Sequence, residues 1–362
     1  MRRVLRYGIT TGACAAAAAK AALITLLSNP VNRIGIPSPI GIRFEILVKE
    51  SRKLSDDTAI AHVIKDSGDD IDVTNKLEIS ATVRLNDDGK IMIKGGNGIG
   101  IATKPGLPVP IGKSAINPVP RRMIEDAIKE ALPDGKGVEV ILSAIGGEKV
   151  AERTLNPKLG VVGGISILGT TGVVKPLSMD AYRRSLVPQI NVAIARGYER
   201  IFLVPGNIGE RITKQLFKVP EDAIIQTGDF MGYMLDKAVE KGVKEIIILG
   251  HPGKLVKLAA GIFNTHHKVA DARKEVIAAY AGAAGADKEL IRMILRSNTT
   301  EEAIEFLKRT SLLQPTFDEI AKRISLRSME RIENKAKIGA ILVSLDETVL
   351  GMDENTRCML HG

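Results

Sequence analysis

The spacing of hydrophobic residues changes near the middle of the 362-residue chain. Between Ile40 and Lys94, apolar and polar residues alternate with a period close to two, which is typical of strands with one buried face. After Leu155-Asn156-Pro157, apolar runs, glycine-containing turns and helical segments follow one another in turn. The first pattern predicts an antiparallel sheet and the second a parallel, doubly wound sheet. We therefore expect a mostly antiparallel α+β domain over residues 1–154 and an α/β domain with C-terminal helices over residues 155–362.

The first domain is predicted to contain a helix of small residues at residues 10–28. Thr10 or Thr11 can be its N-cap, and nearly all of the residues from Ala13 to Ala22 are strong helix formers. Its N-terminus is either a purely structural cap or an anion site. Asp87-Asp88-Gly89 predicts a hairpin turn between two consecutive strands. Strands are expected at residues 42–48, 59–64, 77–85, 90–94 and 138–143, and a second helix at 121–132.

Four strand–turn–helix units are predicted in the second domain. The first strand, residues 161–168, runs into the turn Gly169-Thr170-Thr171-Gly172. Glycines allow a ligand to approach the backbone closely, and the two threonines add hydrogen-bond donors. Since the carboxyl ends of parallel strands line the ligand crevice, we expect all four turns to converge on one edge. Taken alone, the first turn is better explained as an ordinary connection, and it is the recurrence of the pattern in the later turns that favours a ligand site. The other strands are expected at residues 200–204, 223–226 and 245–249, with a last strand at 338–345.

The formal net charge of +9 favours an anionic partner. Nucleic acid is disfavoured because aromatic residues make up only 3% of the chain and do not cluster beside the basic residues. No run approaches the ~20 apolar residues of a membrane span, and the N-terminal alanine-rich run has a helix cap where a signal peptide has a cleavage site. The two cysteines are too few for a disulfide framework. We expect a cytoplasmic protein that does not bind a membrane. The sequence is compatible with a homo-oligomer.

Three polar clusters are candidates for chemistry, and each has a plain structural alternative. Arg121 and Arg122 at a helix start suggest an anionic ligand, or are simply solvated. The aspartates of residues 65–72 suggest a cation loop, or cap backbone N–H groups. In residues 264–273, a histidine held by Asp271 can act as an acid or base, or the segment is a capped helix start. The adjacent histidines do not have the spacing of a metal pair, and we expect no protein-held metal.

The motifs of several common nucleotide enzymes and hydrolases are missing. We find no dinucleotide fingerprint, no phosphate-binding Walker loop and no nucleophile elbow. Five other stretches, in order over nearly the whole chain, resemble the cobalt-precorrin-5B (C1)-methyltransferase family of anaerobic cobalamin biosynthesis. Ile71 departs from this pattern, because we expect proline there. The stretches are residues 7–12, 65–74, 98–121, 163–172 and 250–273.

The resemblance implies transfer of a methyl group from S-adenosylmethionine to C1 of a cobalt-bound tetrapyrrole. A substrate with many carboxylates suits a protein of charge +9. Displacement at a sulfonium depends mainly on alignment, so no protein nucleophile is needed. The runner-up is a non-catalytic carrier of an anionic tetrapyrrole, which transfer of a labelled methyl group would exclude.

On this basis we predict three groups of site residues, with the tetrapyrrole between the domains. The catalytic candidates are His266, as a proton handler, and Asp271. The candidates for binding the cofactor are Gly163, Gly164, Gly169, Thr170, Thr171, Gly172, Gly206, Gly209 and Asp229. The candidates for binding the substrate are Thr10, Thr11, Lys104, Arg121, Arg122, Lys254 and Arg273.

Overall fold

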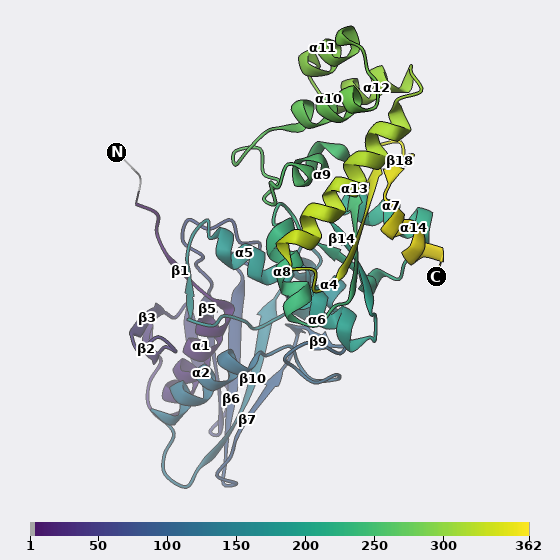
Figure 1. The fold of residues 1–362 in the computed structure, drawn as a ribbon. Helices are drawn as coiled ribbons and strands as arrows, with labels where there is room; N and C mark the ends of the chain where they lie inside the picture. Colours follow the sequence, from purple (N-terminus) through teal and green to yellow (C-terminus); the bar gives the residue numbers. More distant parts are fainter. Residues whose placement is uncertain (1–3, 362) are drawn as a thin grey trace. The chain divides into compact units, whose positions relative to one another are not determined.

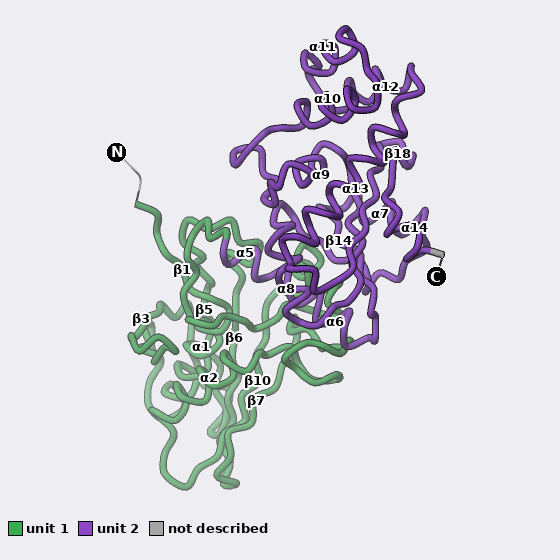
Figure 2. The backbone as a smooth tube through the Cα atoms, in the orientation of Figure 1, with its two compact units in different colours: residues 1–179 green, residues 180–362 purple. Residues whose placement is uncertain are grey.

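A computed structural model describes residues 4–361 of the chain. Contacts between Cα atoms divide it into two compact units, Met1–Met179 and Asp180–Gly362 (Figure 2). This division lies later in the chain than the predicted boundary after residue 154. Each unit has its own sheet and its own helices, so each is described by itself.

Unit 1 is an α+β structure whose main sheet has the strand order β4-β5-β6-β10-β7. All neighbouring pairs are antiparallel except β10 and β7. The mostly antiparallel sheet predicted for the first half is therefore confirmed. Its strands are β4 (Glu50–Lys53), β5 (Thr58–Ile64), β6 (Glu78–Asn86), β7 (Ile91–Gly95) and β10 (Gly137–Ile145). Smaller two-stranded pairs are formed by β1 (Gly8–Ile9) with β13 (Val173–Val174), β2 (Arg33–Pro37) with β3 (Arg43–Leu47), β8 (Gly98–Ile99) with β12 (Gly164–Ile165), and β9 (Ile101–Ala102) with β11 (Val161–Val162).

The predicted hairpin at Asp87-Asp88-Gly89 is wrong. The chain does reverse there, but β10 lies between β6 and β7 and hydrogen-bonds to both. For example, Leu142 of β10 is opposite Ala81 on one side and Gly95 on the other. A turn residue pattern specifies the reversal of the chain, but not whether a later strand enters the gap.

Helix α1 (Thr11–Leu27) forms the centre of the unit 1 core, packed on β5, β6 and α2 (Pro118–Lys129) (Figure 1). The side chain of Thr10 accepts a hydrogen bond from the Ala13 N–H, which confirms the predicted N-cap. The alanines of this helix are completely buried, because small side chains let the helix lie close to the sheet. Two short helices, α3 (Gly147–Ala151) and α4 (Asn156–Leu159), complete the unit.

Unit 2 is built on a five-stranded sheet with the order β15-β14-β16-β17-β18. The first four strands are parallel, and the edge strand β18 is antiparallel to β17. Helices pack on both faces (Figure 1). One apolar layer includes α7 (Asn207–Phe217) and α14 (Glu354–His361), while α9 (Pro252–Ala259) and α13 (Leu313–Arg331) pack on β17. The predicted doubly wound α/β fold of the second half is thus confirmed. The strands are β14 (Arg200–Val204), β15 (Ile224–Gln226), β16 (Glu245–Gly250), β17 (Lys337–Val343) and β18 (Val349–Met352).

The helices of unit 2 follow the predicted alternation with two differences. The helix of the first predicted unit is divided into two, α5 and α6, before Pro188, which has no N–H to continue it. The antiparallel strand β18 and the helix after it have no counterpart in the prediction. The helices are α5 (Met179–Leu186), α6 (Pro188–Ala195), α7 (Asn207–Phe217), η1 (Glu221–Ala223), α8 (Met231–Glu240), α9 (Pro252–Ala259), α10 (Arg273–Ala283), α11 (Lys288–Arg296), α12 (Thr300–Lys308), α13 (Leu313–Arg331) and α14 (Glu354–His361).

The stretch of residues 160–176 is placed differently from the prediction. It does not supply the first strand of the parallel sheet; β11, β12 and β13 pair instead with β9, β8 and β1 of unit 1. Only the turns after β14, β15 and β16 therefore share one sheet edge. The expected convergence of four turns on that edge is reduced to three.

Candidate functional site

The carboxyl edge of the unit 2 sheet contains the position where the strand order changes direction. The chain passes from β14 to β15 on one side, and then to β16 on the other side of β14. In open parallel sheets, ligands bind outside the carboxyl ends of the strands at this switch point. The two loops that flank it meet, since a Cβ added at Gly250 would lie 2.9 Å from the ring of Pro205.

A network of polar side chains lies beside the loop after β14. The amide nitrogen of Gln226 donates to the side-chain oxygens of Asn207 and Glu210, over 2.7 and 2.6 Å. Glu210 is 9% exposed, so its carboxylate is held in place from within the protein. Gly206 precedes this network, and a Cβ added there would meet no atom within 4 Å. The loop thus combines open space over the backbone with fixed acceptor groups.

A second cluster joins the loops after β15 and β16. The Asp229 carboxylate accepts hydrogen bonds from the Thr265 hydroxyl and pairs with the Lys254 ammonium, both over 3.0 Å. Burial by itself raises the pKa of Asp229, but Lys254 outweighs it and the pKa lies below its usual value. The carboxylate is therefore ionised at neutral pH, and next to it lies a cation at the sheet edge.

His266 is brought to this cluster by the backbone of Thr265. The Thr265 N–H donates to the Asp229 carbonyl over 2.9 Å, and the ammonium of the buried Lys257 donates to the Thr265 carbonyl over 2.9 Å. Burial lowers the pKa of Lys257, whose ammonium group is removed from water. Three residues predicted for separate tasks, Asp229, Lys254 and His266, thus assemble in one place.

The expected pairing of a histidine with Asp271 is wrong. Both carboxylate oxygens of Asp271 accept hydrogen bonds from the Arg273 guanidinium, over 2.7 Å each, and this lowers the pKa of Asp271 to about 2. The ring of His266 stacks on that of His267 at 4.5 Å between centroids. The alternative, a helix start at this point, is not found either, because α10 begins only at Arg273. The charges of Asp271 and Arg273 are thus paired with each other, and the substrate contact predicted for Arg273 stays a prediction.

His251, for which the sequence offers no partner, is bound on both ring nitrogens. Its Nδ1 accepts from the Gly253 N–H over 3.0 Å at the start of α9, and its Nε2 contacts the Glu301 carboxylate. Glu301 is 50 positions away in the sequence, so no local pattern signals this pair. The pair fixes the loop after β16 against α12.

In unit 1, the turn at residues 169–172 lies against the N-terminus of α1. The Thr11 hydroxyl accepts a hydrogen bond from the Leu168 N–H over 2.9 Å, and the Gly12 N–H donates to the Leu168 carbonyl over 3.0 Å. Gly169 has φ +130°, and a Cβ there would lie 2.4 Å from the Thr10 hydroxyl oxygen. The predicted substrate residues Thr10 and Thr11 and the predicted cofactor turn thus form one compact structure.

The reason for several of the predicted glycines is internal packing. A Cβ at Gly172 would lie 2.5 Å from the Phe44 ring, and one at Gly164 would lie 2.2 Å from the Gly98 carbonyl oxygen. Gly209 packs closely on Val204 in the same way, at 3.1 Å. Of the predicted glycines, Gly163 and Gly206 are those whose added Cβ meets no atom within 4 Å. Thr170 is exposed, and the Thr171 hydroxyl accepts from the Val173 N–H within the turn.

The predicted cations of unit 1 do not share one contact, because Lys104 and Arg121 reach the carbonyl groups of different segments. The Lys104 ammonium donates to the Lys158 carbonyl over 2.9 Å, and its side chain covers Gly160. Arg121 extends toward the Ile93 carbonyl at 3.4 Å, and Arg122 is exposed. Helix α2 begins at Pro118, so both arginines lie after its first turn rather than at its start.

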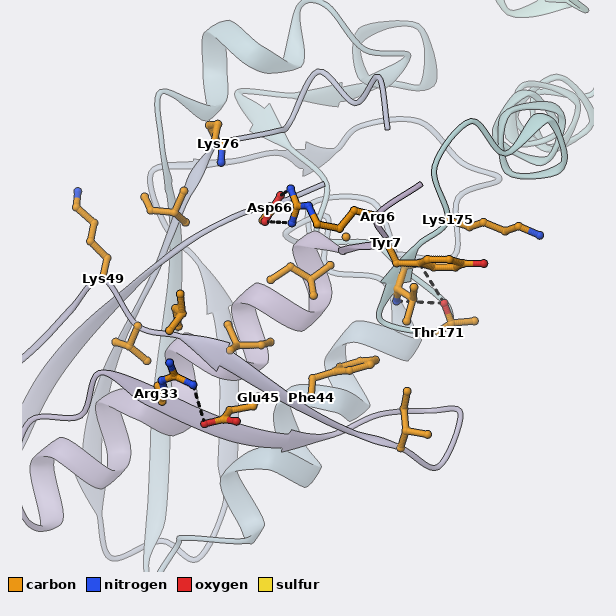
Figure 3. A pocket seen from close by; sticks show the side chains of 18 of the residues that line it. Arg6, Tyr7, Arg33, Phe44, Glu45, Lys49, Asp66, Lys76, Thr171 and Lys175 are labelled. Carbon is orange, nitrogen blue, oxygen red and sulfur yellow. Dashed lines mark hydrogen bonds and ion pairs between the residues drawn. The ribbon is translucent and has the colours of Figure 1, made fainter. Parts of the chain in front are cut away.

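A pocket of about 1320 Å³ in unit 1 was not predicted (Figure 3). It is lined by the segment before α1, the hairpin of β2 and β3, and the residues that follow the turn at 169–172. The Arg6 guanidinium contacts the Asp66 carboxylate on its wall, and this pair lowers the pKa of Asp66 to about 2. Thr171 is the predicted site residue among those that line it.

The aspartates of residues 65–72, beside this pocket, belong to an ordered turn. The Asp66 carboxylate accepts from the Gly68 N–H, and that of Asp72 pairs with the buried Lys65 ammonium over 2.6 Å. Asp69 accepts from the Arg6 N–H, and Asp70 from the Leu177 N–H. These contacts follow the structural alternative given above, in which the aspartates cap backbone N–H groups.

A sequence model of the CbiD family matches residues 1–176, and one of the CbiD C-terminal domain matches residues 264–354. Over 97% of both chains, the protein is 49% identical to a cobalt-precorrin-5B C(1)-methyltransferase of Methanocaldococcus jannaschii. This chain belongs to the CbiD family.

A second relative agrees with this assignment. A cobalt-precorrin-5B C(1)-methyltransferase of Moorella thermoacetica is 46% identical over 99% of this chain and 97% of its own. A crystal structure of the cobalamin biosynthesis protein CbiD of Archaeoglobus fulgidus matches with a TM-score of 0.40 and 30% identity, covering 75% of this chain and 84% of that one. Within the described residues, no helix has the length and apolar character needed to cross a membrane.

The two CbiD matches cover the glycine turn and residues 264–273, but the sheet-edge loops of residues 206–209, 226–229 and 250–254 lie between them. The residues that sequence inspection missed are Glu210, Gln226, His251 and Glu301 at this edge, and Arg6, Lys76 and Lys175 at the pocket. Glu210 directly follows a predicted turn, which was an available signal. The others depend on contacts between distant parts of the chain.

Proposed function

We propose that this protein transfers the methyl group of S-adenosylmethionine to C1 of cobalt-precorrin-5B, giving cobalt-precorrin-6A in anaerobic cobalamin biosynthesis. The observation that carries the proposal is the near full-length identity of 46–49% to relatives named cobalt-precorrin-5B C(1)-methyltransferase. The +9 charge supports a substrate with many carboxylates.

The switch point of the unit 2 sheet is our proposed donor site. S-Adenosylmethionine supplies an activated methyl group on a sulfonium and two ribose hydroxyls for recognition. Gly206 leaves room over the backbone. The Glu210 carboxylate is held by Gln226 on one oxygen and by Lys214 on the other, and its remaining lone pairs can accept from such hydroxyls. The residues present therefore fit a nucleoside-bearing donor. Asp229 and the glycines at 163–172 remain predicted contacts of the donor.

The protein's contribution to rate in this proposal is alignment. The methyl–sulfur bond breaks as the carbon–carbon bond to C1 forms, and the electron pair of the former stays on sulfur. The fixed loops after β14 and β16 hold one reactant, so the displacement needs little further loss of freedom. Lys254, beside Asp229, is a cation available to a substrate carboxylate, and His266 is the proposed proton handler.

Methyl transfer tests the proposal directly. Incubation with donor labelled in the methyl group should transfer label to cobalt-precorrin-5B, and mass spectrometry should locate it at C1. Recovery of unmodified macrocycle, bound but unlabelled, would support the carrier alternative instead.

Two variants test the assigned positions. Gly206→Leu should weaken donor binding by about tenfold or more in calorimetry, because its side chain would fill the open space, while Gly206→Ala keeps the fold as control.

His266→Ala should lower kcat and change its pH dependence; full turnover would remove His266 from the mechanism. Fractionation of producing cells tests the cytoplasmic location we propose.

A further inference from the structure

The pocket of unit 1 combines an apolar wall with an excess of positive charge. Its apolar side chains include Ile40, Ile42 and Leu47 of the β2–β3 hairpin, which are 50%, 52% and 66% exposed. Side chains of this size and exposure, gathered in one cavity, usually mark a binding surface. At about 1320 Å³ the cavity exceeds the range usual for drug-sized ligands, roughly 300–1000 Å³, so it suits a larger molecule.

The basic residues that line the pocket outnumber the acidic ones by five to two. Both acidic groups are already neutralised within the pocket, Asp66 by Arg6 and Glu45 by Arg33 at 3.5 Å. Lys49 is paired with Glu78 over 2.6 Å. Lys76 and Lys175 are exposed and make no ion pair among the described residues. Figure 3 shows the labelled basic side chains spread around the pocket, with Lys49 and Lys175 on opposite sides.

The wall that carries these charges is rigidly built. A Cβ on Gly8 would lie 2.1 Å from the Ser67 carbonyl carbon, so the segment before α1 and the acidic turn are in direct backbone contact. Lys76 has φ +66°, in the left-handed region that lysine seldom adopts. Such strain persists where the surrounding structure fixes it, and it is concentrated at ligand sites.

We propose that this pocket binds the macrocycle of a polycarboxylate tetrapyrrole, with the ring against the hairpin and its carboxylates at Lys76 and Lys175. The inference deepens the proposed function and rests on it for the identity of the macrocycle. It names a substrate site different from the predicted cations Lys104, Arg121 and Arg122. A flat, largely apolar ring with charged acid groups on its rim has the chemistry that this wall complements.

The test is the binding of cobalt uroporphyrin, which carries acid side chains on every pyrrole ring. Binding to the full chain is measured by absorbance titration. The double variant Lys76→Glu/Lys175→Glu should bind it about tenfold or more weakly, and Lys175→Glu alone should show a smaller loss. Lys53→Glu, an exposed lysine of unit 1 outside the pocket, is the matched control and should bind as the wild type does. Thermal unfolding checks that each variant is folded.

Equal affinity of the double variant and the wild type would overturn the inference. An equal loss in Lys53→Glu would overturn it too, because the effect would then be general charge rather than the pocket. Binding of S-adenosylmethionine should be unchanged in the double variant, and its loss would mean that the pocket holds the donor instead.

Methyl transfer separates this inference from the proposed function. If the wild type transfers no methyl group but the probe affinity depends on Lys76 and Lys175, the function fails while the tetrapyrrole pocket stands. If the wild type transfers methyl and the double variant keeps the same KM for cobalt-precorrin-5B, the function stands and the pocket assignment fails.

Discussion

Gly169 is constrained by its neighbours in the folded protein. Its φ of +130° is unfavourable for any residue with a side chain, and the space a Cβ would fill is occupied by Thr10. At Gly206, by contrast, the backbone is extended and no atom is near. A glycine after a strand can therefore be required for either of two reasons. It can be needed for internal packing, as at Gly169, or it can leave open space over the backbone, as at Gly206, and only the open space can admit a ligand.

We predict that Gly169→Ala lowers the free energy of unfolding by about 1–3 kcal/mol, because it adds backbone strain and a steric overlap. Urea unfolding followed by circular dichroism measures this. Gly206→Ala, the control, should change stability by less than about 0.5 kcal/mol. Similar values for the two variants would show that the turn at Gly169 relaxes freely.

Glu130 provides the clearest link between a single residue and pH. The Arg43 guanidinium and the nearly buried Lys20 ammonium both bind its carboxylate and lower its pKa from 4.5 to about 2. The folded state therefore binds fewer protons here than the unfolded state. Stability from this group is fully present above pH 4.5 and is lost as the pH falls toward 2.

We predict that Glu130→Gln costs roughly 1–3 kcal/mol at pH 7 and flattens the loss of stability between pH 4.5 and 2. Unfolding curves at a series of pH values test both parts. Glu125→Gln in the same helix should leave the acid dependence of the wild type intact. A parallel acid profile for the Glu130 variant would contradict the assignment.

At the scale of elements, the packing of helix α1 depends on the small size of its side chains. Its completely buried alanines let the helix axis approach β5 and β6 closely, so a longer side chain would have to displace its neighbours. Because the helix is buried on nearly all sides, it does not have one apolar face and one polar face as an amphipathic helix does.

We predict that Ala17→Leu destabilises the protein by about 1–3 kcal/mol through overpacking. The same substitution at the exposed Ala195, near the end of α6, should be close to neutral. Thermal and urea unfolding of both variants provide the comparison. A neutral Ala17→Leu would mean that the sheet can move away from the helix at little cost.

Elements with strong local signals were predictable from sequence, and those defined by distant partners were not. The cap of α1 by Thr10 and strand β14 both follow from local pattern. The position of β10 between β6 and β7 depends on pairs of residues 47 to 67 positions apart, which no turn residue specifies. Residues 161–174 form two-residue strands, too short for their hydrophobicity to select one sheet over another.

The same distinction applies to the candidate sites. Asp229, Lys254 and His266 could be nominated because they follow strands or glycine turns. The pairs Arg6–Asp66 and His251–Glu301 connect residues separated by 60 and 50 positions. A single sequence gives no sign of such contacts. The pairing of Asp271 is a different case, because Arg273 is only two positions away and the sequence pattern does not decide between two nearby basic partners.

At the scale of the whole molecule, two units with separate sheets divide the proposed tasks. Unit 2 has a closed apolar layer of its own, formed by β14, β15, β16, β17, α7 and α14. The proposed donor site lies at the edge of that sheet, and the proposed macrocycle pocket lies in unit 1.

We predict that residues 180–362, produced alone, unfold cooperatively and bind S-adenosylmethionine within about tenfold of the full chain. Circular dichroism and calorimetry measure the two properties. Cooperative unfolding without donor binding would show that residues 160–176 of unit 1 are needed for the donor, as the sequence pattern suggested. A fragment with no cooperative transition would show that this unit depends on the other for its stability.

The burial of α1 has a consequence for biosynthesis. Its residues leave the ribosome well before the strand that completes their surroundings, which ends only at Ile145. At typical elongation rates of about 5–20 residues per second, the nascent helix waits on the order of ten seconds before its sheet can assemble. During translation this alanine-rich segment therefore lacks the sheet that covers it in the folded protein. Its apolar side chains are then accessible to chaperones that bind emerging chains.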